Sequence, residues 1–244
     1  MASQRLRERL FAILTRLNGE LDSLEFADPV THVYNPLLYA EDPASQYLDR
    51  FLCGPGGRLF LLGMNPGPWG MAQTGVPFGE IEAVRDWLKI QGSVGQPQNS
   101  HPKRPVQGFD CSRSEVSGRR LWGYFAQEFP SSEAFAKKCV VFNYCPLIFL
   151  EESGRNRTPD KLPKAEREPL FAACDECLVA ILRELRIERA IGIGQFAYRR
   201  LTAVKDSVAT LESVESIIHP SPANPHANRG WAEAVSPVLK PSLR

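Results

Sequence analysis

The chain has 244 residues, of which 43% are hydrophobic, and its formal net charge at pH 7 is +1. No apolar run approaches the roughly 18 residues of a membrane-spanning helix, so the composition excludes an ordinary membrane protein and we expect no membrane partner. The nearly balanced charge excludes a protein that binds nucleic acid through general basicity, and any such site must come from locally clustered charges.

The chain begins with a predicted amphipathic helix over residues 3–26. Apolar residues recur there at spacings of three and four, from Leu6 through Leu24. Charged residues interrupt the apolar ones, unlike in a secretory signal, so we expect a soluble intracellular protein, in the cytoplasm or nucleoid of a bacterium or in the nucleus of a eukaryote. Residues 28–45 predict a loop, and Ala44–Phe51 predicts a short helix.

The stretch Leu59–Gly79 combines a short apolar run with a loop rich in Gly and Pro. The run Leu59–Leu62 predicts a buried strand, and the prolines that follow exclude a helix because each lacks a backbone donor. A stiff loop therefore follows the carboxyl end of a buried strand, which is where open α/β sheets bind ligands. The polar side chain of Asn65 stands near the start of this loop, held in a fixed direction as a catalytic site requires.

The middle of the chain alternates predicted helices, loops and a second buried strand. The expected helices are Ile81–Ile90, Leu121–Phe129 and Ser132–Lys138, and the expected loops are Gly92–Gly108 and Ser153–Pro163. The strand Cys139–Phe142 places Asn143 at its carboxyl end. Between residues 102 and 120, five basic residues stand against two acidic ones, a local excess that suits phosphates, although a solvated surface is the simpler interpretation.

The last part of the chain predicts two more strands with helices between them. Lys164–Leu185 and a segment from Gln195 are expected to be helices, Ala190–Ile193 is expected to be a strand, and a further strand ends at His219. Four parallel strands alternating with helices predict a three-layer α/β/α sandwich formed by a single domain, residues 1–244. If the first and last strands are parallel neighbours, Asn65 and His219 face the same crevice.

The six cysteines do not form the pattern of a metal site. Cys174 and Cys177 fit C-x-x-C, but they fall in a predicted helix, where residues i and i+3 share one face. No second pair has zinc spacing, and no four-cysteine pattern indicates an iron–sulfur cluster. We therefore expect free thiols, no metal and no cofactor.

Two motifs at the predicted strand ends carry a family resemblance. GMNPGP at Gly63–Pro68 is followed by GVPFGE at Gly75–Glu80, and HPSP occupies His219–Pro222. Together with HPKRPV, SEVSGRRLWG, NYCPL and SGRNRTP, they resemble the single-strand-selective monofunctional uracil-DNA glycosylases of the uracil-DNA glycosylase superfamily, over about residues 30 to 235. The resemblance implies an enzyme of base excision repair that flips uracil, and 5-modified uracils such as 5-hydroxymethyluracil, out of DNA and hydrolyses the N-glycosidic bond to leave an abasic site.

The resemblance also assigns chemical roles to individual residues. A neutral His219 can donate a hydrogen bond to the base oxygen on which charge develops, and Asn65 can hold the attacking water, so these two are the expected catalytic residues. Phe78 matches the family's aromatic residue that stacks on the flipped base. Asn143 matches its base reader, whose amide complements O4 and N3–H of uracil. The other expected binding residues form the pocket wall with their backbone: Met64, Gly67 and Pro68.

The expected partner is uracil-containing DNA, single- or double-stranded, bound by a monomer. One loop of this chain resembles the family's minor-groove wedge, which fills the gap behind a flipped base. Its expected DNA-contacting residues are Ser221, Pro222, Ala223, Asn224, Pro225 and Arg229. No lysine stands beside Asn65 or His219 in the sequence to form a Schiff base with the sugar, which is consistent with an enzyme without lyase activity.

The sequence leaves two other functions open. The stretch 192–197 fits G-x-G-x-x-A between a strand and a helix, with Glu212 and Glu215 about 20 residues on, as in a dinucleotide-binding protein. Such a fingerprint normally follows the first strand, whereas this one follows the third predicted strand. The other alternative is a non-catalytic reader of damaged DNA, which binds uracil-containing DNA and releases no base.

Overall fold

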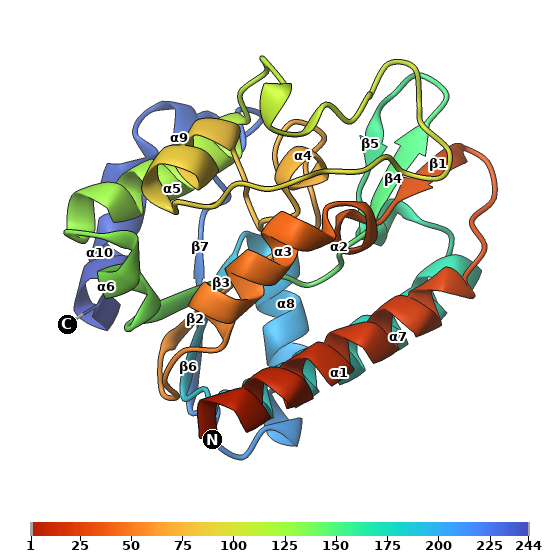
Figure 1. Ribbon diagram of the computed structural model, residues 1–244. Coiled ribbons are helices and arrows are strands. Elements are labelled where there is room, and N and C mark those ends of the chain that lie inside the picture. The colour runs from red at the N-terminus through yellow and green to blue at the C-terminus, as the bar shows by residue number, and fades with distance from the viewer. Residues whose placement is uncertain (1, 244) are drawn as a thin grey trace.

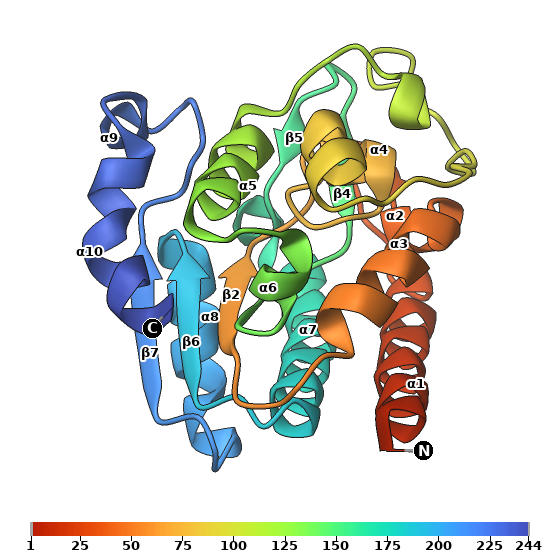
Figure 2. The ribbon, with the colours of Figure 1, turned by 60° about the vertical axis from the view of Figure 1, so that its left-hand side comes forward.

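The computed structural model describes residues 2–243 and is built around a parallel sheet of four strands (Figures 1 and 2). The strand order is β3-β2-β6-β7. In this order the strands span Cys139–Asn143, Leu59–Gly63, Arg189–Ile193 and Ser213–Ile217. Every residue of β2 and β3 is buried, as in a parallel sheet covered on both faces. The expected four-stranded parallel sheet is therefore confirmed.

Alternate side chains of β2 enter two separate hydrophobic cores, one on each face of the sheet. Phe60 and Leu62 belong to the first core, and Leu59 and Leu61 belong to the second. The helices packed in the first core are α1 (Ala2–Asp22), α7 (Lys164–Glu184) and α8 (Gln195–Val204). Those packed in the second are α5 (Val116–Glu128), α6 (Ser132–Ala136) and α10 (Trp231–Leu243). This arrangement is the three-layer sandwich expected from the sequence (Figure 2).

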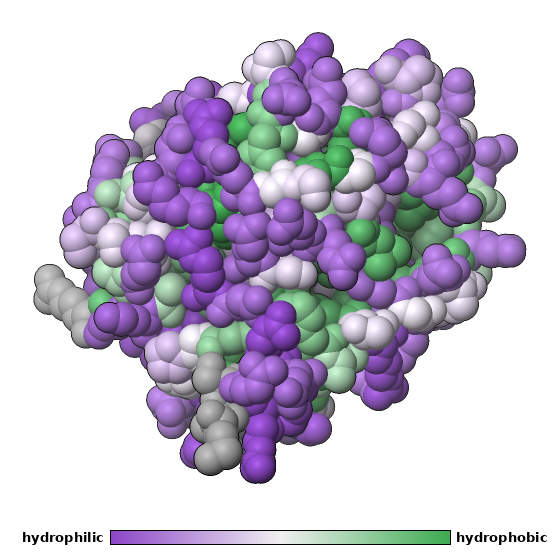
Figure 3. Space-filling model, in the orientation of Figure 1, coloured by the Kyte–Doolittle hydropathy of each residue, from purple (hydrophilic) through white to green (hydrophobic). Residues whose placement is uncertain are grey.

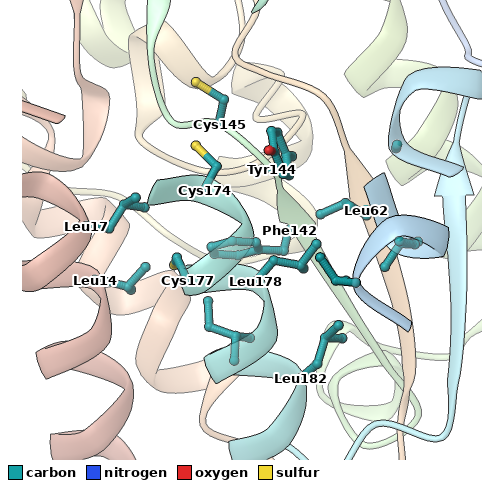
Figure 4. Close-up of a cluster of buried hydrophobic side chains, with 14 of the residues drawn as sticks. Leu14, Leu17, Leu62, Phe142, Tyr144, Cys145, Cys174, Cys177, Leu178 and Leu182 are labelled. Carbon is teal, nitrogen blue, oxygen red and sulfur yellow. The ribbon is translucent and has the colours of Figure 1, made fainter. Parts of the chain in front are cut away.

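The helices α1 and α7 lie side by side and fill the first core with their apolar faces (Figures 1 and 4). Cys174 and Cys177 both lie on the buried face of α7, as their spacing predicts, and Cys145 lies close to Cys174 (Figure 4). All six cysteines are free thiols. Across residues 2–243, no three His, Cys, Asp or Glu side chains are grouped so that they could hold a metal ion.

A second, antiparallel sheet was missed by the sequence analysis. It has the order β1-β4-β5, with strands Val30–Tyr34, Ile148–Glu151 and Asn156–Arg157. The expected loops over residues 28–45 and 153–163 are therefore partly wrong. β1 lacks a clear pattern because only its two end residues are buried, and β5 has just two residues. β1 exists because it pairs with β4, which lies far along the chain.

Short helical segments connect the main elements. They include α2 (Pro36–Tyr39), α3 (Glu41–Tyr47), α4 (Met71–Thr74), α9 (Pro225–Asn228) and 3₁₀ turns at Gly108–Asp110, Pro159–Lys161 and Lys205–Ser207. Two π-helical turns, Leu48–Leu52 and Ala83–Trp87, fall near the helices expected at 44–51 and 81–90. The last strand, β7, ends at Ile217, so His219 stands in the loop beyond it.

The face shown in Figure 3 is mainly hydrophilic, and its hydrophobic side chains appear as separate patches. The large hydrophobic residues with the most exposed surface are Val33 and Leu38. Within the described part of the chain, no helix combines the length and the apolar composition needed to cross a lipid bilayer.

Candidate active site

A cavity of about 600 Å³ opens beyond the carboxyl ends of the parallel strands. The loops that follow β2 and β7 contribute to it together with Asn143, the last residue of β3, as expected for a ligand site of an open α/β sheet. The sequence-predicted residues that line it are Met64, Asn65, Gly67, Pro68, Phe78, Asn143, His219, Ser221, Pro222, Ala223 and Asn224. Pro225 and Arg229 are not among its lining residues, and both are exposed at α9.

The order of the strands that carry Asn65 and His219 differs from the expectation. β6 stands between β2 and β7, so the strands that carry these residues are not neighbours. The crevice nevertheless spans β6, and both side chains line the same cavity. The loops after β2 and β7 are long enough to reach across the end of the strand between them.

The strand β3 places Asn143 opposite Gly63 of β2, with their backbones in register. The Nδ2 of Asn143 lies 3.3 Å from the Sδ of Met71, and thioether sulfur is a weak hydrogen-bond acceptor. A Cβ added at Gly63 would collide with the Oδ1 of Asn143 and would approach the ring of Phe78 to 2.5 Å. Gly63 is therefore what allows the amide and the ring to lie side by side.

Phe78 forms a wall of the cavity and is held in an unusual backbone conformation. Its φ angle is +52°, in the left-handed region that a bulky residue rarely adopts. Its carbonyl accepts hydrogen bonds from the indole N–H of Trp122, at 3.0 Å, and from the backbone N–H of Glu80, at 2.7 Å. The ring centroid lies 5.9 Å from that of His219. The α5 residue Trp122 thus fixes the aromatic wall against the imidazole.

Asn65 has a defined amide orientation. Its Nδ2 donates to the backbone carbonyl of Leu147 at 3.1 Å, so the Oδ1 is turned away from that contact and can accept a hydrogen bond. The neighbouring carbonyl of Pro66 accepts from the Nδ2 of Asn156 at 3.0 Å. These two hydrogen bonds hold the loop after β2 in place from the β4–β5 side.

His219 has a defined tautomer. Its Nδ1 accepts a hydrogen bond from the backbone N–H of Ser221 at 3.1 Å, so the ring proton resides on Nε2, which is then free to donate. Burial lowers the pKa of His219 to about 4, so the ring is neutral at pH 7. The loop is anchored from α5, because Arg120 donates to the carbonyl of Pro220 at 3.0 Å.

Several cavity residues were not singled out by the sequence analysis: Pro66, Trp69, Ser114, Glu115, Val116, Ser117, Asn156 and Thr158. Most belong to SEVSGRRLWG and SGRNRTP, which entered only as parts of the resemblance. Glu115 is the most unusual of them, because its Oε2 is buried and has no hydrogen-bond partner in the described chain. In the sequence it looked like one acidic residue in a basic stretch.

The basic stretch contributes to the rim of the cavity. The guanidinium groups of Arg104 and Arg113 lie 5.1 Å and 4.6 Å from the ring centroid of Trp69, which lines the cavity. Arg119 donates to the Oγ of Ser114 at 3.0 Å. The local charge excess seen in the sequence is therefore partly gathered beside the cavity mouth.

The G-x-G-x-x-A pattern has a structural explanation. A Cβ at Gly192 would collide with the backbone of Tyr198, so this glycine allows α8 to pack closely on β6. Gly194 has a φ of +89°, and a Cβ there would lie 3.2 Å from the Cβ of His219. The two glycines thus serve helix packing and the approach of His219.

The fold and the site together define a class of protein: a three-layer α/β protein with a cavity beyond the carboxyl ends of its parallel strands. The cavity offers an aromatic wall in Phe78, an amide donor and acceptor in Asn143, and a neutral imidazole donor in His219. The uracil DNA glycosylase superfamily model matches residues 51–238. The chain therefore belongs to the uracil-DNA glycosylase superfamily, as the resemblance predicted.

Individual relatives agree with this assignment. The chain is 48% identical over 225 residues to the single-strand selective monofunctional uracil-DNA glycosylase of Rattus norvegicus, an alignment that covers 92% of this chain and 81% of that protein. It is 48% identical over 221 residues to the Bos taurus protein of the same name, covering 91% and 80%. The crystal structure of Pedobacter heparinus SMUG2 superposes with a TM-score of 0.68 at 15% identity, covering 97% of this chain and 96% of that one, and supports the fold.

Proposed function

We propose that this protein is a monofunctional uracil-DNA glycosylase, which hydrolyses the N-glycosidic bond of uracil in DNA and leaves an abasic site. The observation that carries the proposal is the neutral His219, with its proton on Nε2, in the same cavity as the amide of Asn143. The names of the rat and bovine relatives support the same activity. A DNA substrate implies action where DNA lies, in a nucleoid or a nucleus.

The leaving group is stabilised by His219 in this proposal. Uracil departs as an anion, and charge develops on O2 as the bond to the sugar lengthens. A preorganised donor in a water-poor site stabilises such a charge more than water does, and usually provides the largest catalytic term. The Nε2–H of His219 is preorganised because Ser221 fixes the other ring nitrogen.

Base recognition is assigned to Asn143 and Phe78. The Asn143 amide can donate to O4 and accept from N3–H of uracil, whereas cytosine presents the opposite pattern. Its present contact with the sulfur of Met71 is weak, so little is lost when uracil replaces it. The ring of Phe78 stacks on one face of the base.

In this proposal Asn65 binds the water molecule that attacks the sugar. Its Oδ1 can accept a hydrogen bond from a water molecule, since Leu147 holds the amide nitrogen on the other side. A carboxamide is no strong base, so we propose that bond breaking is largely complete before the water adds. Asn65 then positions the water, and no lysine Schiff base is involved.

DNA is proposed to bind across the cavity mouth to a monomer, as a single or a double strand. The loop residues Ser221–Asn224 line the mouth, and Pro225 and Arg229 continue its exposed surface. In duplex DNA this loop would occupy the gap left by the flipped base. The proposed substrates include polar 5-substituted uracils such as 5-hydroxymethyluracil.

Incubation with a single-stranded oligonucleotide that carries one uracil tests the proposal. We expect free uracil to be released in the presence of EDTA, because the proposed steps use side chains alone, and the abasic strand to break only after alkali treatment. Binding without release of uracil would identify a non-catalytic reader instead. Strand breakage without alkali, together with a borohydride-trapped adduct, would contradict the monofunctional assignment.

Gly63→Ala should reduce the single-turnover rate of uracil release by roughly tenfold to a hundredfold, because the new methyl group displaces Asn143 and Phe78, and small displacements of positioning groups are costly. The matched control is Gly123→Ala on α5, where a Cβ would meet no atom of the described chain within 4 Å. The control should keep the wild-type rate and gain about 0.8–1.0 kcal/mol in unfolding free energy, measured in urea. Equal rates for the two variants would show that Gly63 has no such role.

A further inference from the structure

A second groove, apart from the active-site cavity, opens on the surface between α1 and β1. Its volume is about 490 Å³, within the range of roughly 300–1,000 Å³ that is typical of ligand pockets. The carboxyl end of α1, the strand β1, the helix α2 and the loop around residues 96–98 all contribute to this α1–β1 groove. Among the residues that the structure describes, none lines both the groove and the active-site cavity.

The α1–β1 groove has an apolar lining. Hydrophobic side chains gather in the hollow between β1 and the carboxyl end of α1 (Figure 3). Val33 and Leu38, with 37% and 54% of their surface exposed, both belong to this lining, and they are the most exposed large hydrophobic residues of the described chain. Leu21, Phe26 and Leu147 extend the apolar surface. Single exposed apolar residues are ordinary, but several gathered in one hollow are typical of an interaction site.

The surroundings of the groove are acidic. The chain contains no lysine or arginine between Arg16 and Arg50, the stretch that holds the carboxyl end of α1, β1 and α2. Asp22 lines the groove, and Glu25 and Asp28 follow it in exposed positions. The last turn of α1 has no basic residue to neutralise the partial negative charge of its carboxyl end. This surface attracts cationic groups and repels the phosphates of a nucleic acid.

Amide side chains complete the lining of the groove: Asn18, Asn35, Gln96 and Gln98. The Nδ2 of Asn35 donates to the Oδ1 of Asn18 at 2.9 Å, and the Nε2 of Gln96 donates to the carbonyl of Val106 at 2.9 Å. The Nδ2 of Asn18 can therefore still donate, and the Oε1 of Gln96 can still accept. A donor and an acceptor of this kind match the backbone C=O and N–H groups of an extended peptide.

We propose that the α1–β1 groove docks an extended segment of a partner protein that carries apolar side chains together with lysine or arginine. The apolar side chains cover Val33 and Leu38, the basic ones face Asp22 and the acidic residues that follow it, and the amides pair with the peptide backbone. Extended peptides are commonly recognised in this way, by pockets for side chains and hydrogen bonds to the main chain. Docking here is a second function, beyond uracil excision and independent of it.

The probe that tests the docking site is a short, fluorescein-labelled peptide in which leucine alternates with lysine. In an extended chain the leucines then share one face and the lysines share the other. Fluorescence anisotropy measures its binding to the protein of residues 1–244. We expect binding that weakens as salt is added, because salt screens the attraction between the lysines and the acidic residues. Peptides with serine in place of leucine, or with glutamate in place of lysine, should each bind at least about tenfold more weakly.

Variants of the groove locate the bound peptide. Leu38→Ser should weaken binding of the leucine–lysine peptide about tenfold, because less apolar surface is buried in the complex. Leu38→Met keeps the apolar bulk and should bind like the wild type. Asp22→Lys should weaken binding roughly three- to tenfold, because repulsion replaces attraction at an exposed pair of charges. Asp206→Lys makes the same change on the exposed turn Lys205–Ser207, outside the groove, and should keep the wild-type affinity.

Three results of the binding assay would overturn the inference: a wild-type protein that does not bind the leucine–lysine peptide, unchanged binding by both Leu38→Ser and Asp22→Lys, or displacement of the peptide by a uracil-containing single strand. The third result would place the peptide in the active-site cavity. Sedimentation of the protein alone tests the remaining occupant, because a dimer that Leu38→Ser abolishes would assign the groove to a second copy of this chain. None of these measurements follows base release, so docking and uracil excision can fail separately. Thermal melting verifies that each variant is folded.

Discussion

His219→Leu is expected to lower the single-turnover rate of uracil release by roughly 10²–10³-fold. Leucine fills much of the same space but removes the Nε2–H donor, and one such donor is worth about 2.7–4 kcal/mol to a transition state that develops an oxyanion. The rate is measured with enzyme in excess over a uracil-containing single strand, so that a change in DNA affinity does not enter.

The control is His32→Leu, which makes the same substitution on β1, away from the residues that line the cavity. It should retain the wild-type rate. Because the pKa of His219 lies near 4, this group should cause no loss of rate between about pH 5.5 and pH 8, and its protonation should matter only as the pH falls toward 4. A His219→Leu enzyme with nearly the wild-type rate would remove His219 from the mechanism.

Strand ends were the most predictable part of this molecule. Runs such as Leu59–Leu62 and Cys139–Phe142 are short, wholly apolar and bounded by turn signals, which is typical of strands buried on both faces. Asn143 follows the second run directly and Asn65 comes three residues after the first, and polar residues just beyond the ends of parallel strands collect at one edge of the sheet. Asn65, Asn143 and His219 could therefore be assigned to one site from the sequence.

Strand order and the second sheet could not be predicted in the same way. The position of β6 between β2 and β7 is set by how the helices cross over, and no residue of β2 or β7 reveals it. β1 has exposed or half-buried residues at its centre and pairs with β4 across a long stretch of chain. Such strands depend on their partner more than on their own residues.

The cavity residues that the sequence did not reveal were missed for one physical reason. Glu115 precedes α5 and Asn156 belongs to the two-residue strand β5, and both reach the cavity only through the tertiary fold, so no periodicity marks them. A carboxylate in a basic stretch is usually solvated, and burial of its Oε2 is a property of the tertiary structure. The conformation of Phe78 is likewise set from outside, by Trp122.

Asn143→Asp is expected to reduce uracil excision by at least about 100-fold, and it tests base recognition directly. The side chain is buried, and an ionised carboxylate there presents two acceptors to O4 of uracil, which is itself an acceptor, so repulsion replaces a hydrogen bond. A site built to pair a polar edge loses heavily when its partner is mismatched. Single-turnover rates on uracil- and cytosine-containing single strands provide the measurement.

The pH dependence and the alanine variant separate recognition from simple damage to the site. Burial raises the pKa of a carboxyl group, and the new carboxyl group of the Asn143→Asp variant can donate to O4 once it is protonated, so the defect of this variant should be smaller at pH 6 than at pH 8. Asn143→Ala should lose uracil excision at both pH values, because it can neither donate nor accept. The aspartate variant can also accept from N4 of cytosine, which the alanine variant cannot. Uracil excision by Asn143→Asp at the wild-type rate would show that another group reads the base.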